Sequence, residues 1–210
     1  MGTSDIAPPG VPDYVVPMSG HMLSVGGVLW TASYLLYARE SLCTKSYGMP
    51  LWRSPSTSAG RSSTPSTLFY GGVRYGPREG KLYGGRVAGD TTEMGYWTAA
   101  FAQILLSTAS LAQLLVREHS GGVNWSIWAT RFAGSLTGLW AAYLWLWYHW
   151  PEGHPYVVSE ISIFLMIVSI ACDVAYAPVL WSVRRTEKIL PDGSKVAANY
   201  VEPAKMSKAL

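Results

Sequence analysis

The sequence predicts an all-α protein, a polytopic integral membrane bundle in which four helices are visible. The first observation is four apolar runs, each of about the 20 residues that a helix needs to cross a bilayer. The second is composition: 49% of the 210 residues are hydrophobic, against 16 Lys and Arg and 13 Asp and Glu. The third is the abundance of Trp (10) and Tyr (13), which membrane proteins concentrate at their interfaces. Together they argue against an ordinary soluble domain.

The first predicted helix spans residues 20–38 and ends at the charged pair Arg39-Glu40. Residues 1–19 precede it as a polar, proline-containing arm without Lys or Arg, so no secretory signal peptide is expected there. The second predicted helix spans residues 96–116 and stops at Arg117-Glu-His119. A charge directly after an apolar run is typical of a membrane interface.

The third predicted helix spans residues 132–150, and its far end is crowded with Trp and Tyr in the manner of an aromatic belt. The fourth spans residues 157–183 and stops at Arg184-Arg185. The transmembrane domain is therefore expected over residues 20–185, followed by a polar tail over residues 186–210.

Residues 51–95 interrupt this pattern. They begin with a low-complexity stretch rich in Ser, Thr and Pro and continue as a Gly-rich, charged segment. The flanks raise a second difficulty, because the N-terminal arm has no Lys or Arg while residues 183–210 have six. That contrast places the two ends on opposite sides of the membrane, which requires an odd number of crossings. Four helices do not satisfy this, so an odd number of helices is missing or the charge rule misleads.

Asp173 is the leading candidate for a functional residue, because it lies inside the fourth apolar run. An acidic side chain there costs roughly 3 kcal/mol on insertion scales and usually lines a cavity with a function. A structural carboxyl group that hydrogen-bonds a neighbouring helix is the alternative.

Several other classes of site find no support in the sequence. Cys43 and Cys172 are far apart and do not indicate a disulfide framework. The four His residues have no ligand spacing, so no metal site is predicted. We also find no phosphate loop and no basic stripe for nucleic acid. An aspartate-rich cluster for Mg²⁺-diphosphate is absent too, which argues against chemistry that begins with diphosphate ionisation.

Several segments, in order and spacing, resemble a family: the small fungal integral-membrane terpene cyclases called PaxB-like, of indole-diterpene and meroterpenoid pathways. They are Lys45-Ser-Tyr-Gly-Met49, Gln103-Ile-Leu-Leu-Ser107, Gln113-Leu-Leu115, Trp128-Ala-Thr-Arg-Phe-Ala-Gly-Ser135 and Asp173-Val-Ala-Tyr176. The resemblance implies seven transmembrane helices and two acidic residues that matter for catalysis. Asp173 matches one of them. The other, a Glu that follows Tyr-Gly-Met in the second helix, has no counterpart here.

A shifted reading frame would explain the missing Glu. With allowed synonymous codons, the codons of residues 51–65 can be read in another frame as Leu-Ala-Leu-Ser-Phe-Asn-Leu-Gly-Trp-Glu-Val-Val-His-Ala, with the Trp-Glu pair over Ala59-Gly-Arg61. We therefore hypothesise a misframed or mis-spliced second helix within residues 51–95, with the third and fourth helices also lost. Three missing helices would restore seven and satisfy the charge rule.

The resemblance implies cyclisation of an epoxidised prenyl side chain on an indole or polyketide-derived core, without metal or redox cofactor. An acid would protonate the epoxide, so a buried carboxylic acid such as Asp173 is the expected proton donor or a member of an acid pair. Tyr176, one helical turn away, and Trp128 could stabilise the cation through their ring faces. Arg131 is either an interfacial arginine or a further substrate contact.

The same resemblance implies a place in the endoplasmic reticulum membrane, beside a pathway monooxygenase and a prenyltransferase. The substrate would be an epoxidised prenylated small molecule, and the lipid bilayer the surrounding partner. The alternative function is a non-catalytic membrane scaffold or transporter-like fragment, or an inactive truncated cyclase.

Overall fold

A computed structural model describes residues 4–46, 48 and 90–200 of the chain. The helices are α1 (Val15–Thr44), α3 (Thr91–Arg117), α4 (Trp125–Ser135), α5 (Ala142–His149) and α6 (Glu160–Thr186). A π-helical stretch, η2 (Leu136–Ala141), joins α4 to α5 without a break, and a short 3₁₀ helix, η3 (Pro155–Val158), precedes α6. Strands β1 (Lys188–Ile189) and β2 (Lys195–Val196) form an antiparallel hairpin.

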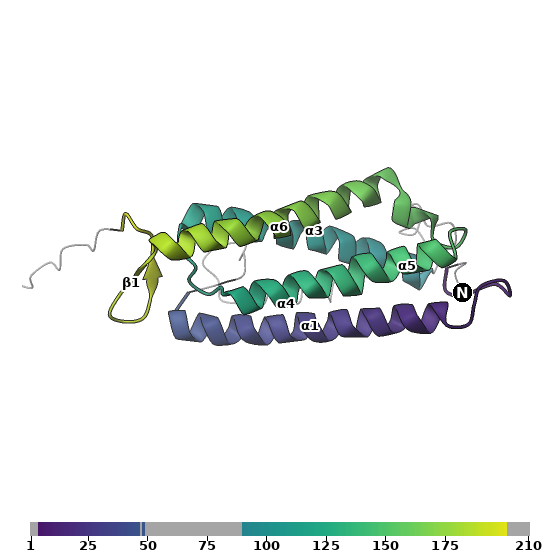
Figure 1. The fold of residues 1–210 in the computed structure, drawn as a ribbon, viewed down its shortest axis with the longest axis horizontal. Coiled ribbons are helices and arrows are strands. Elements are labelled where there is room, and N and C mark those ends of the chain that lie inside the picture. The colour runs from purple at the N-terminus through teal and green to yellow at the C-terminus, as the bar shows by residue number, and fades with distance from the viewer. Residues whose placement is uncertain (1–3, 47, 49–89, 201–210) are drawn as a thin grey trace, which may run out of the picture.

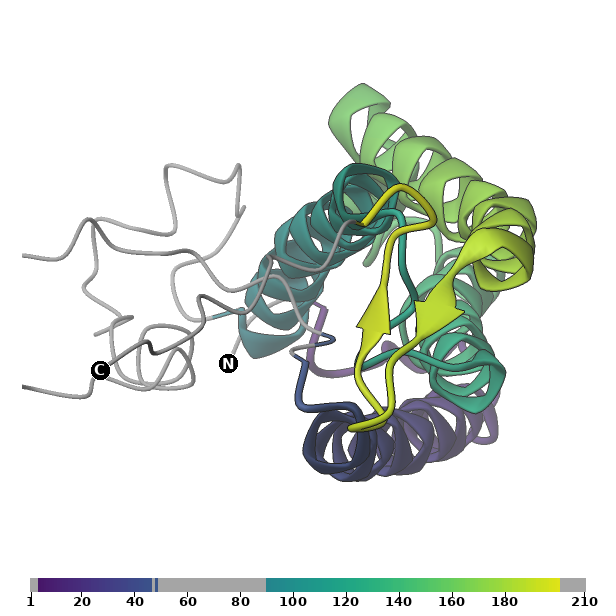
Figure 2. The same cartoon turned by 90° about the vertical axis from the view of Figure 1, so that its left-hand side faces the viewer.

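The helices form an elongated bundle in which α4, η2 and α5 act as one continuous rod (Figure 1). This rod packs against α1, while α3 packs against α6. Viewed from the end, the helices surround a common interior, and the β1–β2 hairpin lies across that end (Figure 2). The predicted all-α bundle is therefore confirmed, and the hairpin is a small addition within the segment expected to be a polar tail.

Each predicted helix has a counterpart whose bounds differ from the prediction. Helix α1 replaces the predicted 20–38 and continues past Glu40 to Thr44, and the Glu40 Oε2 atom accepts a hydrogen bond of 3.0 Å from Asn124 Nδ2. Helix α3 replaces 96–116 and begins earlier, where the Asp90 side chain accepts from the Glu93 main-chain N–H. Such an N-cap satisfies one of the free donors at a helix start.

The other two predicted helices are displaced. The predicted 132–150 becomes the rod from α4 to α5, which begins at residue 125 because the Asn124 side chain caps it. The predicted 157–183 begins at residue 160, where Ser159 caps α6. The irregular region predicted over 51–95 lies outside the described residues up to residue 89, and its last residues belong to α3.

Two described helices, α3 and α6, are long and apolar enough to cross a membrane. Helices α1 and α6 also expose many large apolar side chains, which an aqueous surface would disfavour and a bilayer would cover. On α6 these are Ile161, Ile163, Phe164, Ile167, Val174 and Trp181.

Close contact of α1 with the α4–α5 rod depends on glycine. A Cβ atom added to Gly26 would stand 2.3 Å from the Gly138 Cα atom, so both backbones approach too closely for a side chain at either position. Small residues allow this approach between membrane helices. The contact brings the inner face of α1 against the inner face of α4.

Candidate functional site

Asp173 lies near the middle of α6, and its side chain is 2% exposed. The buried residues of α6 recur every three to four positions, which places them on one helical face: Ser162, Leu165, Ser169, Asp173, Tyr176 and Leu180. This face meets α3 and α4. Asp173 therefore points into the bundle, on the side away from the apolar surface of α6.

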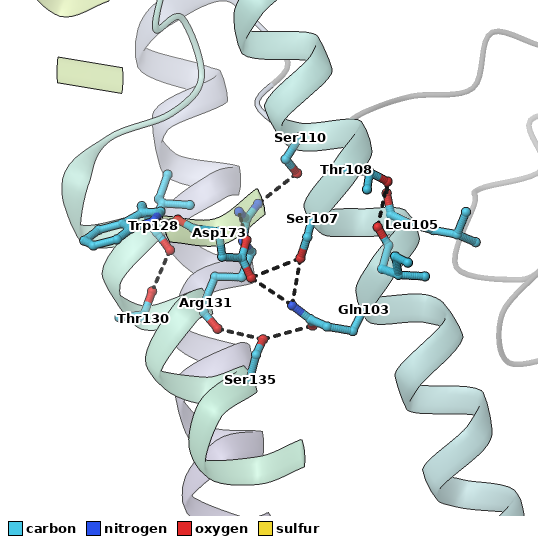
Figure 3. A network of polar contacts seen from close by, with 12 residues as sticks. Gln103, Leu105, Ser107, Thr108, Ser110, Trp128, Thr130, Arg131, Ser135 and Asp173 are labelled. Atoms are coloured by element: carbon cyan, nitrogen blue, oxygen red, sulfur yellow. Dashed lines mark hydrogen bonds and ion pairs between the residues drawn. The ribbon is translucent and has the colours of Figure 1, made fainter. Parts of the chain in front are cut away.

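Both carboxylate oxygens of Asp173 are hydrogen-bonded (Figure 3). Its Oδ1 atom accepts from Arg131 Nη2 at 2.8 Å, which is also a buried salt bridge. Its Oδ2 atom accepts from Gln103 Nε2 and from Ser107 Oγ, each at 3.0 Å. The site thus joins α3, α4 and α6 at one carboxylate.

Arg131, on α4, is the only described cation that forms a salt bridge with Asp173. Its Nη1 atom donates to Ser110 Oγ at 2.8 Å and to Tyr37 OH at 3.3 Å. The interpretation of Arg131 as an interfacial arginine is wrong, since its side chain is 3% exposed and is ion-paired inside the bundle. Removing an arginine from water costs several kcal/mol, and here the carboxylate and two further hydrogen bonds offset that cost.

Ser135 extends the network along α4. Its Oγ atom lies 2.9 Å from Gln103 Oε1 and 3.0 Å from the Arg131 main-chain oxygen. The hydroxyl in contact with Gln103 Oε1 fixes the amide so that its NH₂ group faces Asp173. We call Gln103, Ser107, Arg131, Ser135 and Asp173 the central cluster.

Tyr176 and Trp128, predicted as substrate contacts, both adjoin the central cluster. The Tyr176 ring centroid lies 5.2 Å from Arg131 Cζ, so its ring face contacts the guanidinium in a cation–π arrangement. Trp128 Nε1 donates to the main-chain oxygen of Asp173 at 2.8 Å, and its ring stacks on Phe132 at 5.6 Å. Asp173, Tyr176, Trp128 and Arg131, the four residues proposed from the sequence, are therefore brought together.

Sequence reasoning did not assign a role to Gln103, Ser107, Ser110, Ser135 or Tyr37. A signal for three of them was present, because residues 103, 107 and 110 recur at helical spacing on one face of an otherwise apolar run. A polar stripe of that kind indicates a buried partner in a membrane helix. Tyr37 carried no comparable signal, since one Tyr among several at the end of an apolar helix is typical of an interface.

Chemically, the central cluster holds a carboxylate opposite a guanidinium, and that arrangement is most stable with both groups charged. The sequence had suggested a carboxyl group in an apolar setting, so the environment of Asp173 is more polar than expected. The described residues contain no group of three His, Cys, Asp or Glu side chains that could hold a metal ion. Residues 51–67, where the shifted-frame hypothesis places the second carboxyl group, lie outside the described part of the chain and contain no Asp or Glu in the present frame.

Comparison with known proteins gives a consistent result. Residues 81–186 match the family of Pyr4-like transmembrane terpene cyclases. Terpene cyclase ascF of Acremonium egyptiacum is 34% identical over 91% of this chain and 91% of its own length. The Pyr4-family terpene cyclase mfmH of Annulohypoxylon moriforme is 29% identical over 84% and 91%. Terpene cyclase paxB of Penicillium paxilli is 34% identical over 49% and 42%. No solved structure matches.

The alignment with ascF also bears on the length of the chain. It extends over 248 positions, whereas the whole chain has 210 residues. At least 38 aligned positions of that relative therefore have no residue opposite them here.

Proposed function

Since the chain belongs to the Pyr4-like transmembrane terpene cyclases and is a membrane terpene cyclase of fungal secondary metabolism, we propose that it cyclises an epoxidised prenyl side chain. The observation that carries this proposal is the charged central cluster inside an apolar bundle. Ionisable groups within a membrane are costly and are kept where they act on a substrate or ion. The substrate class follows from the resemblance to relatives of meroterpenoid and indole-diterpene pathways.

The proposed reaction begins with transfer of a proton from a carboxylic acid to the epoxide oxygen. The C–O bond at the more substituted carbon breaks, which leaves a hydroxyl group on one carbon and a cation on the other. Neighbouring alkenes attack the cation in sequence, each forming a C–C bond and passing the positive charge on. Loss of a proton to a base ends the sequence, so the acid is regenerated overall and no oxidant or reductant is consumed.

We assign Asp173 to the charged member of an acid pair. The guanidinium of Arg131 stabilises its ionised form, and a carboxylate near a second carboxyl group helps that group to retain its proton. Arg131 contacts the carboxylate directly, the Tyr176 ring packs on the Arg131 guanidinium, and Trp128 holds the α6 backbone at Asp173. The partner carboxyl group is the Glu expected from the shifted frame over residues 51–67.

The missing length supports this assignment. The 38 or more aligned positions that ascF has in excess are enough for at least one further transmembrane helix, which needs about 20 residues. We therefore propose that the chain as it stands turns over little or no substrate. Restoration of the second helix with its Glu would restore activity.

The cellular setting is also a proposal. The protein would cross the endoplasmic reticulum membrane several times, with the bilayer covering the apolar faces of α1 and α6. Its substrate would be made by a prenyltransferase, which attaches the chain, and by a monooxygenase, which epoxidises the terminal alkene.

The test is product formation in microsomes supplied with an epoxidised prenylated arene. The chain as given is compared with a version whose residues 51–67 are replaced by the shifted-frame helix, after resequencing of the transcript; Asp90 and the first turn of α3 stay unchanged. Asp173→Asn in the restored protein should reduce product formation by a factor of at least 100, since it removes the carboxylate but keeps the shape (~2.7 kcal/mol on the barrier). The buried Ser169→Ala change, whose hydroxyl contacts only the Met166 carbonyl, serves as control.

A second interpretation rests on the saturation of Asp173, whose two oxygens accept three hydrogen bonds from described residues. Such a carboxylate can be purely structural, as in a membrane scaffold or an inactive truncated cyclase. Full activity of the restored Asp173→Asn protein would favour this interpretation and remove Asp173 from the catalytic residues. A transcript that encodes residues 51–95 in the present frame only would reject the shifted-frame hypothesis.

A further inference from the structure

Two buried polar atoms beside the central cluster have no hydrogen-bond partner within the described part of the chain. They are Ser33 Oγ on α1 and Arg131 Nε on α4. Ser33 is 0% exposed and Arg131 is 2% exposed. An unpaired polar group so deeply buried costs about 1–3 kcal/mol, so its persistence indicates a partner other than the residues that the structure describes.

The two atoms belong to the same region of the α1–α4 contact. Helices α1 and α4 run in opposite directions, with Gly26 against Gly138 and Trp30 against Gly134. Continuing this register by one turn places Ser33 level with Arg131. Tyr37, one turn further along the same face of α1, receives a hydrogen bond from Arg131 Nη1, which shows that the guanidinium reaches this face of α1.

The contacts of Arg131 leave Nε as the one guanidinium nitrogen without a hydrogen-bond partner among the described residues. Nη1 is used by Ser110 and Tyr37, and Nη2 by Asp173. The Nε–H group can only donate, whereas the Ser33 hydroxyl can donate or accept. An oxygen atom with two lone pairs, and with no charge of its own because Asp173 already balances Arg131, would satisfy both.

We propose that Ser33 Oγ and Arg131 Nε bind the epoxide oxygen of the substrate. The proposal rests on the function proposed above, because an epoxide is the oxygen that such a substrate carries at its reacting end. Two hydrogen bonds would place this oxygen beside the central cluster and would favour the epoxide over its alkene precursor. Ser33 is therefore a specificity-determining residue of α1.

Packing alone does not account for Ser33. Gly26 shows that α1 uses a residue without a side chain where the helices approach most closely. At Ser33 an alanine would fill nearly the same volume without burying an unpaired hydroxyl group. The hydroxyl group is thus the feature that requires a ligand.

The test measures binding of two ligands to the full chain in lipid nanodiscs: a prenylated arene with a terminal epoxide and the same compound with the terminal alkene. Ser33→Ala should weaken binding of the epoxide by about 3- to 12-fold, the value of one neutral hydrogen bond, and should leave alkene binding unchanged. The matched control is Ser169→Ala, which removes an equally buried hydroxyl group that has a partner in the Met166 carbonyl. It should change neither affinity.

Two outcomes would overturn the proposal. If Ser33→Ala weakened binding of both ligands equally, Ser33 would contact an oxygen on the arene core and not the epoxide. If it weakened binding of neither, Ser33 would have a structural role only. Because binding is measured without turnover, this result is distinguishable from a failure of the proposed function. Discrimination between epoxide and alkene, with no product formed by the protein whose second helix is restored, would support the site and reject the reaction. Product formation by the restored protein without such discrimination would do the reverse.

Discussion

Two regions of the bundle stabilise aspartate side chains in different ways. In the central cluster, Asp173 depends on a charged side chain from another helix, Arg131 at 2.8 Å. At the start of α3, Asp90 and Asp5 instead accept hydrogen bonds from main-chain N–H groups: Asp90 from Glu93 at 3.0 Å, and Asp5 from Thr92 at 3.0 Å. We call the second region, which also includes Ser4, His154 and Tyr156, the α3 cap.

The difference shows what each carboxylate requires. A helix start always offers free N–H groups and a positive dipole end, so Asp5 and Asp90 are stabilised by local structure. Asp173 lies mid-helix, where main-chain donors are already used, and needs a partner brought by tertiary packing. Loss of one residue from the α3 cap should therefore cost little folding free energy, whereas loss of one residue from the central cluster leaves a buried charge unpaired and should cost much more.

The largest expected effect on stability comes from removing Asp173 while its partner Arg131 remains. Asp173→Ala leaves Arg131 buried without its counter-charge and should reduce the free energy of unfolding by about 3–5 kcal/mol. The double change Asp173→Leu with Arg131→Met should recover most of that loss, because it removes both charges. Chemical unfolding in detergent micelles measures all three proteins. If the double variant were as unstable as the single one, the unpaired charge of Arg131 would not be the cause of the instability of Asp173→Ala.

The next effect is a pH dependence at the α3 cap. Burial lowers the pKa of His154 from 6.5 to about 4, against the opposing influence of Asp90 and Asp5. Between these two values the unfolded chain binds a proton that the folded chain does not. The contribution of His154 to the free energy of unfolding is therefore fully present above pH 6.5. It is lost as the pH drops toward 4, and the loss is at most about 3 kcal/mol at 1.36 kcal/mol per pKa unit.

His154→Gln should remove this slope, as measured by unfolding at pH 4.5, 5.5 and 7. The exposed His21 provides the control, and His21→Gln should leave the slope unchanged. An identical slope in the His154 variant would assign the acid sensitivity to other groups.

A third effect concerns the contact that presents α1 to the central cluster. Gly26→Ala places a Cβ atom 2.3 Å from Gly138 Cα, so the helices must separate, with an expected loss of about 1–3 kcal/mol. Gly27→Ala is the matched control, since its Cβ would meet nothing within 4 Å. Equal stability of the two variants in micelles would contradict the close contact between α1 and the α4–α5 rod.

Much of the fold could be predicted from the sequence, because long apolar runs bounded by charges specify membrane helices. The helix ends could not, since they depend on partners such as Asn124, which both caps α4 and contacts Glu40 on α1. Asp173 could be identified from the sequence because an acidic side chain inside an apolar run is energetically unfavourable and therefore stands out. Its pairing with Arg131 was not, because an arginine near the start of an apolar segment is equally typical of an interface and only packing decides between the two.

The smallest effect tests the local nature of the α3 cap. Asp5→Ala removes an acceptor for the main-chain N–H groups of Thr91 and Thr92 and should cost about 1 kcal/mol at pH 7, the usual value of a helix cap. Burial alone would raise the pKa of Asp5, but hydrogen bonds from Thr92 and Thr91 lower it below 3.8. The stability it contributes is therefore present above pH 3.8 and is lost as the pH falls through the lowered pKa.

The cost of Asp5→Ala should accordingly shrink in acid, while the exposed Asp13→Ala control should cost little at any pH. The decisive comparison is with Asp173→Ala under the same conditions. If both aspartate variants lost equal stability, the contrast between a carboxylate held by main-chain donors and one held by a buried cation would fail. A several-fold difference would instead show that stability in this bundle depends on its central charges, which a chain without catalytic need for them would have had reason to replace by apolar side chains.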